Sequence, residues 1–393
     1  MKVFCFPVQY RLLRLRCFFS LLSLLFTSAV PVFVSAQTAP LQFTPIPYSE
    51  PDIVSPGRGA EQWENGSESV NYPFIDSTCR SLDVYARFPW TRLEDSVAGK
   101  YNWTYFDNLI TEAIDSGQKL SFGIMPVYDG EGTVVYDGAK SAYPLYLHQV
   151  MNSAVPNSRD WVSNGVWIPN WNHSYYLARL RALHMALNAH ILQSSYKGVS
   201  YKDAIFYIDV RGYGNYGEWH NAGIVEHIED YPPGRRPSVF TLKRIIDYHT
   251  KIFTQWPLVL MIATFDAEQY DAIMNPAEIT HYALTSRNEW GPLGWRRDQW
   301  GATDPYLDKI LKNNEKSYDN SAPFKDMITT RYLTAPVTGE PPRYVSPGGP
   351  CDYWDLENQL STYGASSLGN GNWGKKLTGC GQENARAAFK RAG

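Results

Sequence analysis

Short apolar runs alternate with amphipathic segments along most of this chain. The runs predict β-strands, and the segments whose apolar residues recur at helical spacing predict α-helices. The first expected strand begins at Gly59, and the others cover residues 82–88, 120–127, 205–210, 258–264, 281–286, 336–342 and 365–373. The expected helices cover residues 102–116, 174–192, 237–253, 306–313, 324–333, 355–363 and 383–391. Such an alternation is typical of an α/β fold with parallel strands and crossover helices.

The number of strand–helix units decides between two α/β architectures. Eight units favour a closed (β/α)8 TIM barrel over a doubly wound sheet. No glycine-rich dinucleotide motif or P-loop opens any of the expected helices. We therefore expect a barrel over residues 51–393, with a long loop at residues 128–172 after the third strand.

The N-terminal residues have the pattern of a secretory signal peptide. Four basic residues precede the apolar run of residues 17–33, and the small-residue stretch 34–36 resembles a cleavage site. No later segment is long and apolar enough to cross a bilayer. The sequence thus predicts a signal peptide at residues 1–36, a linker at 37–50, and a mature chain that is secreted to the periplasm or the extracellular space.

The net charge argues against polyanionic partners. The whole chain has a formal charge of -3, and loss of the four basic residues of the leader changes it to -7. An acidic protein of this kind does not attract nucleic acid or anionic membranes. No Cys/His cluster has zinc-site spacing, so we expect neither a metal nor another cofactor.

Three cysteines remain after residues 1–36 are removed, namely Cys79, Cys351 and Cys380. Their odd number excludes complete pairing within one chain. In an oxidising compartment Cys351 and Cys380 could form a disulfide, with Cys79 left as a buried thiol.

Aromatic residues make up 15% of the chain, including 13 Trp and 27 Tyr. A large core accounts for part of them, but many Trp residues lie in Gly-, Asn- and Pro-rich stretches that are typical of surface loops. Flat rings beside polar side chains suit the apolar faces and hydroxyl edges of sugars. The composition therefore favours a carbohydrate as substrate or ligand.

Two glutamates follow expected strands on opposite sides of the barrel. Glu218 follows the fourth strand in the segment GYGNYGEWH, and Glu340 follows the seventh. The carboxyl ends of barrel strands are where these enzymes hold catalytic residues. A pair of carboxyl groups is the minimum equipment for glycoside hydrolysis, one as proton donor and the other as nucleophile or base. The alternative for Glu218 is a loop residue that caps the next helix or faces water.

Further polar and aromatic side chains are expected at the same end of the barrel. The candidates for sugar binding are Arg58, Arg87, Asn215, Trp219, His220, Glu289, Trp290, Asn372 and Trp373. Glu289, expected after the sixth strand, is also an alternative second carboxylate or a salt-bridged loop residue. Asp209 lies within the fourth strand, and if it points inward we expect it to pair with Arg58, Arg87 or Arg211.

Several segments resemble clan A glycoside hydrolases. The stretch RFPWTRLEDSVAGKYNWTYFDNLITEAIDSGQKLSFGI (residues 87–124) is similar to their second strand and helix. The GRG, GEWH and GNGNW segments resemble a group of secreted, galactosidase-like barrel proteins whose activity is uncharacterised. The resemblance covers most of residues 50–390 in order.

The resemblance implies a retaining mechanism with specific residue roles. It makes Glu218 the acid/base and Glu340 the nucleophile, with Arg87 holding the nucleophile ionised and Trp373 forming the floor of the sugar subsite. Relatives commonly continue into a C-terminal β-sandwich, so we expect a truncated gene that lacks this domain.

One departure from the family pattern supports a different function. Most clan A members have Asn directly before the acid/base, whereas this chain has Gly217 there and Asn215 two residues earlier. The alternative function is therefore a non-catalytic carbohydrate-binding protein on a degenerate TIM barrel, because fold does not imply function. An esterase is disfavoured because the chain has no G-x-S-x-G motif.

Overall fold

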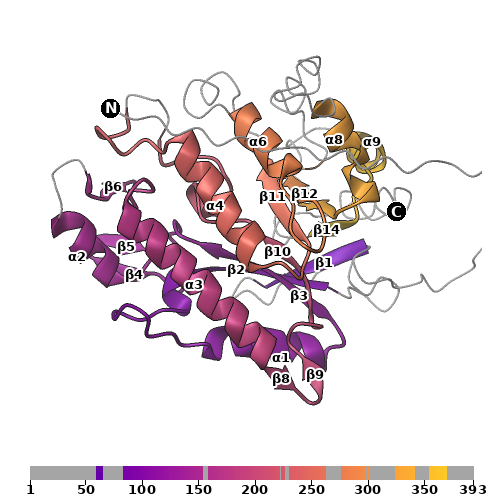
Figure 1. Cartoon of the computed structure of the whole chain (residues 1–393), viewed down its shortest axis with the longest axis horizontal. Helices are drawn as coiled ribbons and strands as arrows, with labels where there is room; N and C mark the ends of the chain where they lie inside the picture. Colours follow the sequence, from indigo (N-terminus) through magenta and orange to yellow (C-terminus); the bar gives the residue numbers. More distant parts are fainter. Residues whose placement is uncertain are drawn as a thin grey trace, which may run out of the picture. The chain divides into compact units, whose positions relative to one another are not determined.

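Eight parallel strands form the central sheet of this protein (Figure 1). They are β1 (Gly59–Glu64), β2 (Asp83–Pro89), β3 (Lys119–Met125), β10 (Ile205–Asp209), β11 (Leu258–Ile262), β12 (Gly294–Arg297), β13 (Val337–Gly339) and β14 (Ser367–Gly369). Each strand pairs with the next one along the chain as far as β13, and β1 also pairs with β14. The amide of Ser366, just before β14, donates to Val337 O of β13 at 2.6 Å. The sheet is thus nearly closed on itself, which confirms the expected (β/α)8 TIM barrel.

The computed structural model describes residues 59–64, 83–153, 158–221, 223–225, 230–262, 276–297, 300, 324–340 and 354–369. All of them belong to one unit, Pro51–Gly393. The expected signal peptide, the linker, Cys79, Cys351, Cys380 and the expected helices at 306–313 and 383–391 lie outside the described residues. Within these ranges, no helix has the length and apolar character needed to cross a membrane.

In the described ranges, a helix precedes each strand of the central sheet from β3 to β14. These helices are α1 (Thr104–Asp115), α3 (Ser174–Gln193), α4 (Val239–Ile252), α6 (Pro276–Thr285), α8 (Phe324–Thr330) and α9 (Trp354–Tyr363). Figure 1 shows α3 and α4 packed side by side on the outside of the sheet. The helix α4 begins after Ser238, whose hydroxyl accepts from Thr241 N at 3.1 Å and so satisfies a free amide at the helix start.

The sixth strand is not where the sequence predicts it. Residues 281–286 form the end of α6 and the turn after it, and the sixth strand is β12. A short apolar run does not distinguish a strand from a buried helix turn by periodicity. The strand β12 has the sequence GWRR and is buried throughout. Because two of its four residues are arginines, a search for apolar runs does not find it.

The long segment between β3 and α3 is folded, although the sequence predicts a loop there. It contains α2 (Leu145–Ser153) and a small sheet of four strands in the order β4, β5, β7, β6. These strands are β4 (Val134–Tyr136), β5 (Ala139–Ser141), β6 (Trp161–Ser163) and β7 (Val166–Ile168). Asp137-Gly138 and Asn164-Gly165, both with positive φ, form their tight turns and are the local signal of hairpins.

The remaining elements are short. They are the hairpin strands β8 (Ser195–Tyr196) and β9 (Val199–Ser200) and the 3-10 turns Trp90–Arg92, Asn215–Gly217 and Arg331–Leu333. The hairpin lies between α3 and β10, so it belongs to the end of the barrel where strands begin. The turn Asn215–Gly217 lies at the other end, after β10.

Candidate active site

The inside of the barrel carries an unusual amount of buried charge. Successive side chains of a strand point to opposite faces, so alternate residues of each strand face the barrel interior. The inward set comprises Glu61 and Trp63 on β1, Tyr85 and Arg87 on β2, Tyr207 and Asp209 on β10, and Arg296 on β12. Charged groups in such a place are stable only when they are paired.

A tightly wound loop after β10 positions Glu218. Backbone φ is positive at five residues, Gly212, Gly214, Tyr216, Gly217 and Trp219, which folds the chain sharply back on itself. The amide of Glu218 donates to Asn215 O at 2.9 Å and closes the last turn. The loop leaves the Glu218 residue only 5% exposed.

The glycine before Glu218 has a structural reason. Gly217 has a φ of 69°, and a Cβ atom at this position would lie 2.9 Å from the Cβ atom of Arg211. Any other residue would meet both a backbone penalty and a close contact. The backbone path here therefore excludes the Asn that most clan A members place at this position.

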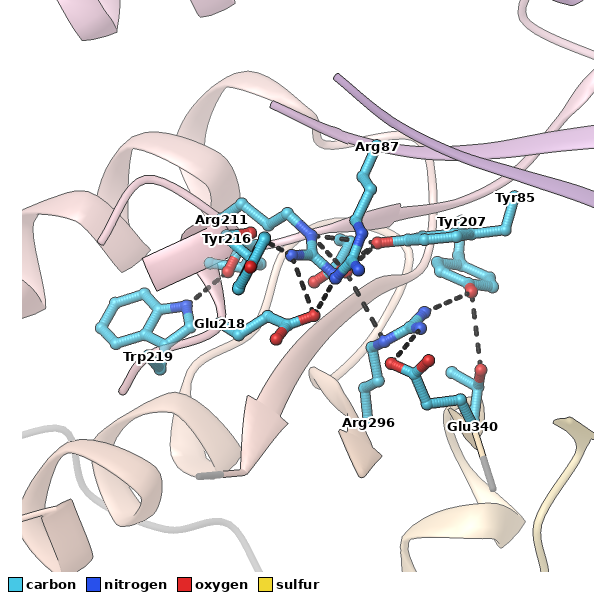
Figure 2. Close-up of polar contacts among 12 residues, drawn as sticks. Tyr85, Arg87, Tyr207, Arg211, Tyr216, Glu218, Trp219, Arg296 and Glu340 are labelled. Atoms are coloured by element: carbon cyan, nitrogen blue, oxygen red, sulfur yellow. Dashed lines mark hydrogen bonds and ion pairs between the residues drawn. The ribbon is translucent and has the colours of Figure 1, made fainter. Parts of the chain in front are cut away.

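Three cationic or polar groups surround the Glu218 carboxylate, and Figure 2 shows Arg87 and Arg211 among them. Arg87 Nη1 donates to Oε1, Arg211 Nη1 lies 3.5 Å from the same oxygen, and His220 Nε2 lies 3.4 Å from Oε2. Burial by itself would raise the pKa of Glu218, but Arg87, His220 and Arg211 together outweigh it and hold the pKa well below its ordinary value. Glu218 is consequently ionised at neutral pH.

The second glutamate follows β13 and contacts a different arginine. Glu340 is 3% exposed, and its Oε1 atom lies 3.8 Å from Arg296 Nη2. Its amide donates to Arg297 O at 3.0 Å, and its carbonyl accepts from Trp300 N at 2.8 Å. These two backbone hydrogen bonds fix the position from which the Glu340 side chain extends.

Arg296 occupies the middle of the barrel and is shared among several acids. Its guanidinium carbon lies 4.2 Å from the ring centroid of Tyr85 and 4.8 Å from that of Trp63. Besides Glu340, it approaches Asp209 Oδ2 at 3.9 Å and Glu61 Oε1 at 4.0 Å.

The pairing of these acids differs from one to the next. Asp209 forms a close ion pair with Arg211 at 2.8 Å, which confirms the expected pairing of this strand residue. Glu61 accepts a hydrogen bond from Tyr207 at 2.8 Å, but burial outweighs this bond and Arg296, and raises the pKa of Glu61 to about 7. One buried acid is thus partly protonated near neutral pH.

The structure brings together some of the expected site residues and separates others. Arg87 and His220 contact Glu218 directly, and Asn215 closes the turn before it. Arg87, expected to hold the nucleophile ionised, pairs with Glu218, and Arg296 lies 3.8 Å from Glu340. Arg58, Asn372 and Trp373 lie outside the described residues.

Three of the expected sugar-binding residues lie away from the Glu218 carboxylate. The indole of Trp219 points away from it into the core, where its N–H donates to Val210 O at 2.5 Å (Figure 2). Glu289 and Trp290 are exposed in the connection from α6 to β12. That connection lies where strands begin, the opposite end from Glu218, because the strand expected before these residues is a helix.

Several residues of the site were not expected from the sequence, namely Arg296, Tyr216, Glu61 and Tyr207. The spacing of Tyr207, Asp209 and Arg211 by two residues is a signal that could have placed them on one face of β10 and the extended residues after it. For Arg296 the local sequence offers no such signal. Across the described ranges, no three His, Cys, Asp or Glu side chains are placed to hold a metal ion.

Comparison with known proteins supports the fold. Neither a protein-family model nor a curated protein sequence matches this chain. The catalytic domain of β-amylase from Paenibacillus polymyxa is similar in structure, with a TM-score of 0.51 and 9% identity over 86% of this chain and 100% of that one. This similarity supports the TIM-barrel fold.

Two further solved structures have lower TM-scores. Endo-glycoceramidase II from Rhodococcus sp. has a TM-score of 0.39 and 11% identity, over 80% of this chain and 72% of that one. An exo-β-1,4-mannosidase from Opitutaceae bacterium strain TAV5 has a TM-score of 0.41 and 10% identity, over 78% of this chain and 52% of that one.

Proposed function

We propose that this protein is a secreted glycoside hydrolase that uses Glu218 and Glu340 to cleave a glycosidic bond. The observation that supports this most strongly is the position of the two buried glutamates, one in the loop after the fourth strand of the barrel and the other directly after the seventh. Both therefore belong to the end of the sheet where TIM-barrel enzymes hold their catalytic groups. The similarity in fold to a β-amylase catalytic domain agrees with this proposal.

The proposed reaction is a double displacement with retention of configuration. Glu218 donates a proton to the leaving oxygen while the Glu340 carboxylate attacks the anomeric carbon and forms a glycosyl ester. Glu218 then removes a proton from water, which cleaves the ester and releases the sugar with its original anomeric configuration. Arg296 Nη2 lies 3.8 Å from Glu340 Oε1 and places a positive charge beside the proposed nucleophile.

The proton-donor role of Glu218 requires that Arg87 move away from its carboxylate. A proton donor has to be protonated, whereas the ion pair with Arg87 favours the ionised form of Glu218. The Arg87 side chain is 20% exposed, while that of Arg211 is fully buried, so a substrate can reach Arg87 first. The proposed mechanism therefore includes displacement of Arg87 from Glu218 when the sugar binds.

Secretion is part of this proposal because residues 1–36 have the pattern of a signal peptide. N-terminal sequencing of the protein exported by its host tests it. A mature chain that begins at Gln37 would agree, and retention of the full leader in the cell would contradict it.

The activity is tested with a panel of nitrophenyl glycosides and reduced oligosaccharides, and the anomer of the first product is read by NMR. We expect hydrolysis with retention in the wild type and a loss of at least about 1,000-fold in Glu340→Gln. Glu131→Gln, at an exposed carboxylate, is the matched control and should retain full activity. Inversion would contradict the double displacement, and unchanged activity in Glu340→Gln would exclude this residue.

A second function is favoured by one observation. Glu218 is held by two arginines and a histidine, which is also typical of a structural ion pair. The chain would then be a non-catalytic carbohydrate-binding protein. Retardation of the wild type in gels that contain a soluble polysaccharide, without hydrolysis of any panel member, would support this second function over the first.

A further inference from the structure

The turn that carries Glu218 has an unexpected residue at its tightest position. Tyr216 has φ 51° and ψ 12°, Gly217 has φ 69°, and the hydrogen bond from Glu218 N to Asn215 O closes the turn. Two successive residues with positive φ are the pattern of a type I′ turn, which favours Asn, Asp or Gly at the first of them. A bulky aromatic residue in this conformation is an outlier.

The other non-glycine residues with positive φ have an ordinary explanation. Asp137, Asn164 and Lys197 each precede a glycine in a hairpin turn and are polar. Trp219 is buried, and its indole hydrogen bond and core packing compensate for the strain. Among the described residues, Tyr216 alone combines a strained backbone with a bulky ring that reaches the surface.

The Tyr216 ring borders the Glu218 ion pair. The guanidinium carbon of Arg87 lies 5.3 Å from the ring centroid, and the ring of Tyr128, from the segment after β3, lies edge-on at 6.0 Å. Figure 2 shows Arg87, Arg211 and Tyr216 grouped around the Glu218 carboxylate. Since Arg87 contacts both Tyr216 and Glu218, a ligand that displaces Arg87 uncovers the aromatic face and the carboxylate together.

We propose that Tyr216 is a substrate-contacting residue whose ring packs against the apolar C–H face of a pyranose bound at Glu218. This inference rests on the proposed function. An asparagine would form the same turn with less strain and would present Glu218 equally well. The strain of a bulky residue at such a position points to a function of its side chain.

The decisive variant is Tyr216→Asn, which keeps the turn and removes the ring. We expect its Tm to stay within about 2 °C of the wild type, because relief of strain offsets the lost ring contacts. KM for the aryl glycosides that the wild type hydrolyses should rise about 5- to 10-fold. Tyr216→Phe keeps the ring and should stay within about twofold of the wild type.

Lys197→Asn is the matched control, since Lys197 holds the same turn position in the β8–β9 hairpin at the other end of the barrel. It should leave both Tm and KM unchanged. If Tyr216→Asn lowers Tm by more than about 5 °C, the ring is structural and the proposal is overturned. An unchanged KM would also overturn the proposal for Tyr216. If Glu340→Gln still abolishes hydrolysis, the proposed glycosidase activity stands all the same.

Binding separates this inference from the activity. If the wild type hydrolyses no panel member, affinity electrophoresis with soluble β-glucan, galactomannan and starch replaces KM as the measurement. Weaker retardation of Tyr216→Asn than of Tyr216→Phe would support the sugar contact even though the proposed activity has failed. Equal retardation of the two variants, or no retardation of the wild type, would overturn it.

Discussion

Two buried clusters of this protein have the contacts of catalytic groups, and they differ in surroundings. One is the Glu218 site. The other joins Ser141, His148 and Asp160 in the segment between β3 and α3, with His148 Nε2 2.8 Å from Ser141 Oγ and His148 Nδ1 hydrogen-bonded to Asp160 Oδ2. By contacts alone, this second cluster resembles a Ser-His-Asp triad.

The surroundings of the second cluster indicate a structural role. Ser141 and His148 are fully buried, as is the Asp160 side chain. The Ser141 hydroxyl donates to Tyr143 O at 2.8 Å, and the His148 ring is stacked on the rings of Tyr136 and Tyr143 at centroid distances of 4.5 and 4.4 Å. A substrate carbonyl has no room beside such a serine.

The Glu218 site differs in access and in position. Arg87 is partly exposed, and Glu218 follows a barrel strand at the end where TIM-barrel enzymes bind their substrates. Hydrogen-bond geometry alone therefore does not distinguish the proposed catalytic site from the structural cluster. Access and position in the fold separate the two clusters.

The largest expected difference between the clusters is in activity. Glu218→Gln should lower kcat/KM for aryl glycosides by at least about 1,000-fold, because it removes the proton donor. Asp160→Asn, assayed at a temperature where it is folded, should stay within about threefold of the wild type. Steady-state kinetics with both variants measures this difference. Equal losses of kcat/KM would show that the two clusters do not differ in their importance for activity.

Stability should show the opposite order. Asp160→Ala leaves a buried histidine without its carboxylate and should lower the free energy of unfolding by about 3–5 kcal/mol. Glu218→Gln should cost less than about 2 kcal/mol, because Arg211 keeps its ion pair with Asp209 and Arg87 can reach water. Urea denaturation measures both values, and a larger loss in Glu218→Gln would indicate that this ion pair is structural.

The role of Arg87 can be read from the pH dependence of activity. Arg87 lowers the pKa of Glu218, so Arg87→Leu should raise it. For a proton donor, the alkaline limb of kcat/KM should move to higher pH, because this parameter reports the protein without substrate. The alkaline limb of the pH profile of kcat should move little. This parameter reports the complex with substrate, in which Arg87 is already displaced from Glu218.

The opposite shift would assign a different role to Glu218. If Arg87→Leu moves the acid limb of kcat/KM upward and leaves the alkaline limb in place, Glu218 acts as an ionised carboxylate. Arg92→Leu is a suitable control, because Arg92 pairs with the exposed Glu131 instead.

The smallest expected effect concerns the triad-like serine. Ser141→Ala removes hydrogen bonds to His148 and Tyr143 and should lower the free energy of unfolding by about 1 kcal/mol. It should leave glycoside hydrolysis unchanged and remove no esterase activity, as measured with nitrophenyl acetate. A lost esterase activity would give the second cluster a catalytic role.

The segment from β10 to His220 could be predicted because its signals are local. An apolar run, alternating inward residues and glycines at sharp turns all lie within a few residues of one another. The strand β12 could not be predicted, because its buried Arg296 is stabilised by acids on β1, β10 and after β13. A search of short sequence segments cannot detect ion-pair partners that lie so far apart in the chain.

The sequence by itself determined the barrel and the place of both glutamates, because strand periodicity and turn residues act over short distances. It also contains the arginines that the site needs. Only the tertiary structure decided that Arg87 pairs with Glu218, 131 positions away, and that Arg296 lies beside Glu340. The physical reason is that closure of the sheet brings particular strands face to face across the barrel, and ion-pair partners follow from that arrangement.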